Sequence, residues 1–103
     1  MGSRRPSREC VDEPECEWDR AKAWSNLRKQ GVSFPEATTV FRDRHARLRG
    51  ERLRGDEVRQ VIIGLSDVGR LLVVVFVDRG RIRIISTRRP TPFERHAYQQ
   101  ADA

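Results

Sequence analysis

The stretch Leu71-Leu72-Val73-Val74-Val75-Phe76-Val77 decides the fold class of this 103-residue chain. An apolar run of this length, rich in β-branched residues, is typical of a strand that is buried on both faces. Glycine-containing turns bound the run at residues 67–70 and at residues 78–80. We therefore expect a central strand over 71–77 that has a neighbouring strand on each side.

Both segments that flank the central strand alternate between apolar and polar residues. Residues 81–85 read Arg-Ile-Arg-Ile-Ile, and residues 57–65 place Arg59 on the same side as Val61 and Ile63. A period of two predicts half-exposed strands, and the short turns between them predict an antiparallel meander.

Upstream of the meander the pattern is weaker. We expect a short strand around residues 46–49. The segment from Arg49 to Asp56, which contains three arginines and two glycines, is interpreted as a mobile loop.

Capping signals predict three helices. We expect the first after Asp19, ending at Gly31, and the second from Ser33 to near Asp43. The third should begin at the capping box Thr91-Pro92-Phe93-Glu94 and run to about Ala101. The order of elements is then two N-terminal helices, an antiparallel sheet of about four strands and a C-terminal helix, which is an α+β domain.

Helical spacing assigns faces to the first helix. Ala21, Trp24 and Leu27 recur at three-residue steps and should face the core, whereas Lys22, Asn26 and Lys29 share the opposite, exposed side. That exposed stripe is either a grip for a phosphate backbone or simply the solvated face of an amphipathic helix. The residues that we expect in the core are Phe34, Phe41, Ile63, Val73, Val75, Ile84 and Phe93.

The N-terminal residues have a different composition. Residues 1–14 are expected to be a disordered tail, and residues 15–103 a single domain. Six acidic residues and no basic ones lie between Glu9 and Asp19, either as a solvated leader or as a cover for the chain's own basic face. Cys10 and Cys16 have neither the partners nor the spacing of a zinc site or a disulfide framework, so we expect no metal and no cofactor.

The chain is strongly basic, with 21 Lys and Arg against 15 Asp and Glu, a net charge of +6. All of these cations except Lys22 and Lys29 are arginines. Arginine presents a planar fork that matches phosphate, so the excess suits nucleic acid or an acidic protein, although Arg-rich codon usage would also produce it. No apolar run is long enough to span a membrane and no signal peptide is evident, so we expect a cytoplasmic protein.

Candidate chemistry gathers where the sheet is expected to end. Ser86-Thr87-Arg88-Arg89 leads into the helix that carries Glu94 and Tyr98, and Arg59 lies on an apolar strand face. Arg59 is either an arginine at the sheet margin that reaches water or a phosphate-binding group at the rim of a groove. RNA cleavage needs little more, because the 2′-hydroxyl can attack its own phosphate if side chains move two protons and cations hold the developing charge.

Many short motifs, in register, resemble one family, the BrnT toxins of BrnT/BrnA toxin–antitoxin systems. They span Glu17 to Tyr98. The motifs are Glu17-Trp18-Asp19, Lys22, Asn26, Lys29 to Phe34, Glu36-Ala37, Val40-Phe41, Glu57, Arg59, Ile63 to Ser66, Gly69 to Val75, Arg83 to Ser86, Arg88, Glu94-Arg95 and Tyr98.

The resemblance implies a fold similar to RelE-type toxins and an endoribonuclease that stops translation. Because the sequence contains no metal-ligand cluster and has an arginine-rich sheet end, we expect the cleavage to be independent of metal. It also implies a ribbon-helix-helix antitoxin, BrnA, through which alone the complex would bind operator DNA. The expected catalytic residues are Arg59, Arg88 and Arg83 on the scissile phosphate, with Glu57, Glu94 or Tyr98 in proton transfer. The expected RNA-binding residues are Lys22, Asn26, Lys29, Ser86 and Arg89.

The chain departs from the family pattern at two histidine positions. Gln30 and, by our alignment, Leu53 stand where the family usually has His. If either His moves a proton, this chain lacks that group, and we expect either weaker activity or another base such as Glu57 or Tyr98. The alternative function is a non-catalytic basic module that binds nucleic acid or an acidic partner.

Overall fold

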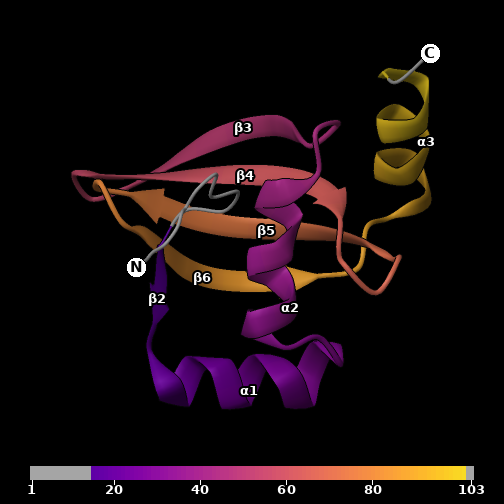
Figure 1. The fold of residues 1–103 in the computed structure, drawn as a ribbon. Helices are drawn as coiled ribbons and strands as arrows, with labels where there is room; N and C mark the ends of the chain where they lie inside the picture. Colours follow the sequence, from indigo (N-terminus) through magenta and orange to yellow (C-terminus); the bar gives the residue numbers. More distant parts are fainter. Residues whose placement is uncertain (1–14, 102–103) are drawn as a thin grey trace, which may run out of the picture.

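The computed structural model describes residues 15–101 and has one sheet at its centre. Its strands are β2 (Cys16–Trp18), β3 (Arg47–Arg54), β4 (Glu57–Leu65), β5 (Leu71–Asp78) and β6 (Ile82–Arg88). The strand order is β2-β6-β5-β4-β3 (Figure 1). β3 to β6 form the predicted antiparallel meander, whereas β2 pairs with β6 in parallel. The sheet is therefore mixed and has five strands rather than about four.

The helices begin and end where the capping signals predicted. They are α1 (Arg20–Gln30), α2 (Phe34–Thr38), which continues as the 3₁₀ helix η1 (Thr39–Arg42), and α3 (Pro92–Ala101). The Asp19 carboxylate accepts hydrogen bonds from the backbone N–H groups of Ala21 and Lys22, and Gly31 ends α1 with a left-handed φ of 71°. Thr91 and Glu94 cap α3 reciprocally, as in a capping box.

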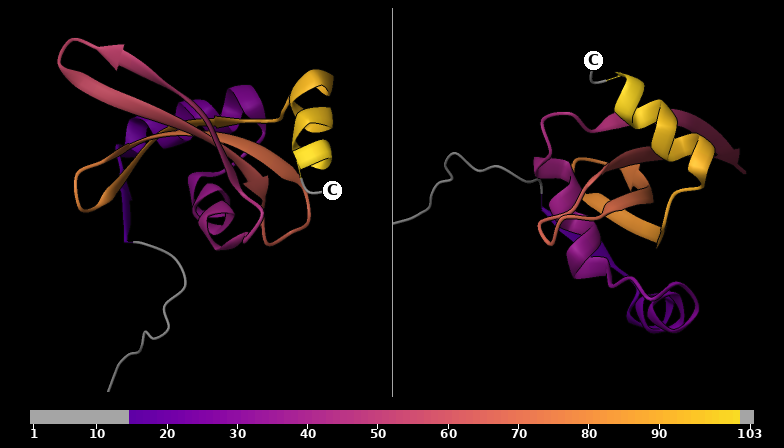
Figure 2. Two further views of the ribbon diagram at one scale, coloured as in Figure 1. Left: turned by 90° about the horizontal axis from the view of Figure 1, so that it is seen from above. Right: turned by 90° about the vertical axis from the view of Figure 1, so that its right-hand side faces the viewer.

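The two faces of the sheet are covered unequally. α2 and η1 pack on one face, where Phe34, Ala37 and Val40 meet Leu72 and Val74 in the main core. The other face carries a small cluster of Val61, Ile63 and Val73, against which Val75 and Tyr98 pack. Among the helices within residues 15–101, α3 alone contributes to that second cluster, and it stands at one end of the sheet (Figures 1 and 2). We call this second side of the sheet the open face.

The predicted inward side of α1 is wrong. Trp24 is 63% exposed and Leu27 40% exposed, whereas Ala23 and Asn26 face inward and are half-buried. The reason is where the helix packs: α1 runs beside β6 at the edge of the sheet, not across an apolar face (Figure 1). A helix at a strand edge meets backbone N–H and C=O groups, which an amide satisfies better than a leucine does.

Two further expectations need correction. Phe93 is 74% exposed and not part of the core, because the inward positions of α3 are held by Glu94, Ala97 and Tyr98. Residues 49–56 are not a loop, since β3 continues to Arg54 as the antiparallel partner of β4. The other expected core residues are buried, except for Phe41 and Val75, which are half-buried.

The expected tail, residues 1–14, lies outside the described residues, as does Cys10. None of the helices within 15–101 has the length and apolar character that crossing a membrane would need.

Candidate nucleic-acid interface on the open sheet face

Strand register brings all three predicted catalytic arginines to the open face. Val73 is paired with Arg88, Val75 with Ser86 and Val77 with Arg83. Directly paired residues of antiparallel strands point to the same side, so these three β6 residues share the side of Val73 and Val75. On β4, Arg59 lies two residues before Val61 and therefore points to the same side.

The arginines are spread over this face rather than gathered at one point. Arg59 and Arg83 are separated by one intervening strand, which is about 10 Å. Arg88 lies five residues beyond Arg83, about 13 Å or more along the sheet. Three side chains at such separations suit successive phosphates of a chain better than a single phosphate, so the arrangement favours a track over the single cluster that we expected.

Arg88 is held rigidly by Glu94. Its guanidinium donates to both carboxylate oxygens, with N–O distances of 2.8 and 2.9 Å, and also to the backbone carbonyl of Arg89. The bidentate bond to Arg88 outweighs the effect of burial and lowers the pKa of Glu94 to about 2. A carboxylate with so low a pKa is a weak base, and its geometry favours a role in positioning Arg88 rather than in proton transfer.

Glu57 is the carboxylate beside Arg59. Arg59 Nε lies 3.3 Å from Glu57 Oε1, and Arg79 donates to the other oxygen at 2.9 Å. Both Glu57 and Arg59 are half-buried, with 25% and 22% of their side chains exposed. The ion pair offsets the free-energy cost of partly burying the charge of Arg59 on an apolar strand face. It also places the Glu57 carboxylate next to an arginine that is a candidate for binding phosphate.

Tyr98 and Asp43 form a contact that the sequence did not reveal. The Tyr98 hydroxyl donates to Asp43 Oδ2 at 2.6 Å, and the backbone N–H of Leu65 donates to the same oxygen at 2.7 Å. These hydrogen bonds lower the pKa of Asp43 against the raising effect of burial. The contact ties α3 to the end of η1. The sequence indicated only that Asp43 lies at the end of the second helix, and it did not indicate that Tyr98 contacts Asp43.

Asp43 can reach Leu65 because β4 has a glycine at Gly64. A Cβ at Gly64 would lie 2.7 Å from Val40 Cγ1, 3.0 Å from the Ala46 Cβ and 3.2 Å from Asp43 Oδ2. The absence of a side chain therefore lets η1 approach the strand closely.

The three residues predicted to form an exposed stripe on α1, Lys22, Asn26 and Lys29, have different environments in the structure. Lys22 and Lys29 are exposed, and they line a hollow of about 200 Å³ with Ile85 of β6. Asn26 lines the same hollow but points at the backbone: its Nδ2 donates to the carbonyls of Thr87 and Val32, and its Oδ1 accepts from the Thr87 N–H. The Asn26 amide thus satisfies the backbone N–H and C=O of Thr87 at the edge of β6, as a neighbouring strand would.

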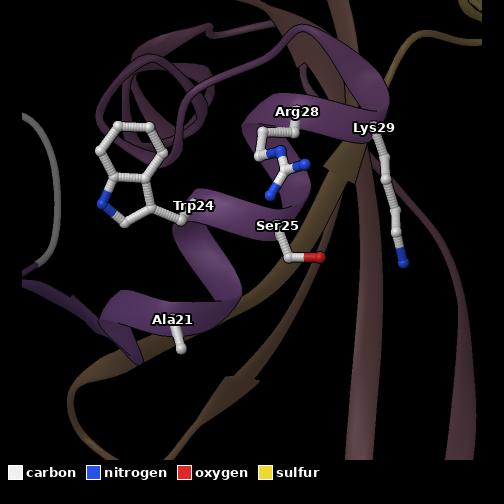
Figure 3. A pocket seen from close by; sticks show the side chains of 5 residues that line it. All are labelled: Ala21, Trp24, Ser25, Arg28 and Lys29. Atoms are coloured by element: carbon white, nitrogen blue, oxygen red, sulfur yellow. The ribbon is translucent and has the colours of Figure 1, made fainter.

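The outer side of α1 carries a mixed surface. Ala21, Trp24, Ser25, Arg28 and Lys29 line a shallow depression there, and Figure 3 shows their side chains projecting from the helix. Trp24 is the large apolar group of this surface.

Arg89 lies on a different side from Arg88. Its charge helps to lower the pKa of Glu36, which packs on the α2 side of the sheet. The largest cause of that lowering is Arg70, which donates to both Glu36 oxygens at 2.9 and 2.7 Å, and Ser66 donates to one of them at 2.7 Å. This cluster links α2 to the turn before β5, and sequence reasoning did not find it. Arg89 is not brought to the open face.

Part of the acidic leader covers basic residues. Glu17 lies 3.1 Å from Arg81 Nε and 3.4 Å from Arg83, and Glu15 lies 3.4 Å from Arg81. Of the leader acids that the structure describes, Glu15 and Glu17 therefore pair with arginines at the start of β6, whereas Asp19 caps α1. Within residues 15–101 no group of three or more His, Cys, Asp or Glu side chains is placed to hold a metal ion.

Comparisons with known proteins agree with this architecture. A family model described as "Ribonuclease toxin, BrnT, of type II toxin-antitoxin system" matches residues 18–94. Among solved structures, the crystal structure of the Brucella abortus ribonuclease toxin BrnT superposes with a TM-score of 0.58 at 22% identity, over 76% of this chain and 97% of that chain. No curated protein matched the sequence.

Proposed function

The chain belongs to the BrnT family of ribonuclease toxins of type II toxin–antitoxin systems, and we propose that it is itself an endoribonuclease that cleaves RNA without a metal and so inhibits translation. The observation that carries the proposal is the set of arginines on the open face. Arg59, Arg83 and Arg88 lie on the side of the sheet that α2 leaves uncovered.

The proposed reaction is an attack of a ribose 2′-hydroxyl on the adjacent phosphorus. A base takes the hydroxyl proton, the bond between phosphorus and the 5′-oxygen breaks, and a proton is delivered to that leaving oxygen. Negative charge builds on the non-bridging oxygens during the attack, and guanidinium groups that are already oriented stabilise it without reorganisation. The products would be a 2′,3′-cyclic phosphate and a free 5′-hydroxyl.

We assign the roles from the contacts on this face. Arg59 would hold the scissile phosphate and Arg83 an adjacent one, and Glu57, bonded to Arg59, would accept the proton of the 2′-hydroxyl. Glu94 would position Arg88 on a neighbouring phosphate, because both of its oxygens are engaged by that arginine. Tyr98, which donates to Asp43, would chiefly anchor α3 beside the face.

The flanking RNA would be held by groups at the β6 edge. Ser86 lies on the open face between Arg83 and Arg88, and Lys22 and Lys29 line the adjoining hollow. These lysines would contact phosphates without reading sequence.

A protein antitoxin would neutralise this activity. The family description names a type II toxin–antitoxin system, and we propose a BrnA-like ribbon-helix-helix antitoxin through which alone the complex would contact operator DNA. The complex would act in the cytoplasm, where its RNA substrate is. We also propose that the fold is similar to that of RelE-type toxins.

Two measurements test this function. Induction of the chain in bacteria should arrest growth, and co-expression of the small gene expected beside it should relieve the arrest. The purified chain should cleave RNA equally with and without EDTA. Activity that EDTA abolishes and manganese restores would contradict the metal-free mechanism, and RNA binding without any cleavage would favour the non-catalytic module instead.

A further inference from the structure

A β-bulge determines which side of the sheet the arginines of β3 face. β3 is in register with β4 as Arg47↔Ile63 and Leu48↔Ile62, but the next pair is Gly50↔Val61, so Arg49 is an extra residue. One extra residue exchanges the two sides of a strand for everything that follows it. Beyond the bulge, Arg52 is paired with Arg59 and Arg54 with Glu57.

This shift places Arg52 and Arg54 of β3 on the open face, where Arg47 already lies before the bulge. Arg52 and Arg54 share the side of Arg59 and Glu57, and Arg47 shares the side of Ile63. Leu48, Glu51 and Leu53 are paired with Ile62, Gln60 and Val58 and point to the opposite side. Without the bulge, Arg52 and Arg54 would face away from Arg59, so the irregularity gathers these three arginines on one side of the hairpin.

The arginines of this hairpin are available to a ligand. Every residue of β3 is exposed. In the described part of the chain neither Arg52 nor Arg54 is paired with a carboxylate, because the nearby Glu57 is already bound by Arg59 and Arg79. The partner that would fit them carries negative charges along its length.

We propose that the β3–β4 hairpin is an RNA-binding arm in which Arg52 and Arg54 contact phosphates on one side of the scissile bond. This inference rests on the proposed function. Arg52 extends the row of Arg83 and Arg59 across the sheet to its edge strand, and Arg54 lies two residues nearer the tip of the hairpin. Arginines scattered only to discourage pairing at an edge strand would have no reason to share one side.

The test compares two variants that lose the same charge. Arg52→Ala/Arg54→Ala removes the cations of the arm, and Arg20→Ala/Arg28→Ala removes two exposed arginines of α1. Affinity is measured against a 20-nucleotide random-sequence single-stranded RNA with 2′-O-methyl riboses, which the chain cannot cleave by 2′-hydroxyl attack. The titration is repeated at several salt concentrations. A third variant, Arg52→Lys/Arg54→Lys, restores the charge, and urea unfolding confirms that each variant folds.

The Arg52→Ala/Arg54→Ala variant should bind RNA roughly tenfold or more weakly than the parent. The slope of log affinity against log salt should fall in magnitude by about 1.4, because each of the two lost phosphate contacts to single-stranded RNA contributes about 0.7. The lysine variant should recover most of the affinity and slope, and the α1 variant should match the parent. Equal affinities and slopes for the arm and α1 variants would overturn the inference, as would an arm variant that loses only antitoxin binding. Absence of cleavage by the parent on unmodified RNA would instead refute the proposed function, while the binding comparison would still decide whether the arm contacts RNA.

Discussion

Replacing Asn26 with alanine tests whether this residue stabilises the fold or binds RNA. The side-chain amide makes three hydrogen bonds of 2.9–3.1 Å, to the N–H and C=O of Thr87 and to the C=O of Val32. Thr87 and Val32 are buried, so these backbone groups would have no ready replacement in water.

The expected cost follows from those three contacts. At about 1 kcal/mol for each hydrogen bond that is lost to a buried partner, Asn26→Ala should lower the free energy of unfolding by about 2–4 kcal/mol. That is a large share of the 5–15 kcal/mol or so that stabilises a typical domain. The variant Asn26→Asp should also be destabilised, because a carboxylate would face two carbonyl oxygens.

The assay is urea unfolding followed by circular dichroism, with Gln30→Ala as the matched control. Gln30 is an exposed amide on the same helix and lines the same hollow, so its replacement should change stability by less than about 0.5 kcal/mol. An unchanged midpoint for Asn26→Ala, together with a loss of RNA affinity, would refute the structural reading and restore the predicted role on the RNA-binding stripe.

Three further outcomes follow from the contacts. Glu94→Gln should cost about 1–2 kcal/mol at neutral pH. Because folding lowers the pKa of Glu94 from 4.5 to about 2, its contribution to stability should be full above pH 4.5 and be lost toward pH 2 in the parent. The variant should show a smaller fall over that range, because Glu36 and Asp43, whose pKa values are also lowered, still contribute to it. Tyr98→Phe should cost about 1 kcal/mol in urea unfolding and leave the cleavage rate within a few-fold, whereas a loss of a hundredfold or so would make its hydroxyl a proton donor. Gly64→Ala should cost about 1–3 kcal/mol in the same assay, because its Cβ would overlap Val40; an unchanged midpoint would contradict the tight packing of η1.

The elements that the sequence predicted correctly are those with local signals. The buried run at 71–77 and the alternation at 81–85 needed no knowledge of distant residues, and the caps at Asp19, Ser33 and Thr91 specify their helices within a few residues.

The elements that sequence reasoning missed depend on pairing between distant segments. β2 has three residues and exists because β6 offers it an edge. β3 contains glycine and charged residues with little strand preference, and its pairing with β4 overrides that preference.

The candidate site was predicted by residue type more accurately than by arrangement. Arg59, Arg83 and Arg88 do share one face, but nothing in the spacing showed that Arg88 is bound to both oxygens of Glu94 or that Tyr98 reaches Asp43. The wrong placement of Asn26 on the exposed side of α1 came from assuming that this helix packs on an apolar surface. Apolar periodicity cannot identify a helix that lies along the polar edge of a strand.

The most direct test of the account compares Arg59→Lys with Arg79→Lys in single-turnover RNA cleavage. Both arginines bind Glu57, but Arg59 lies on the open face, whereas Arg79 is 72% exposed in the turn between β5 and β6. Lysine keeps the charge and loses the planar fork. We predict that Arg59→Lys slows cleavage by about a hundredfold or more, with RNA affinity within a few-fold of the parent, and that Arg79→Lys cleaves like the parent. Equal cleavage rates for the two variants and the parent would contradict the assignment of the open face as the catalytic surface.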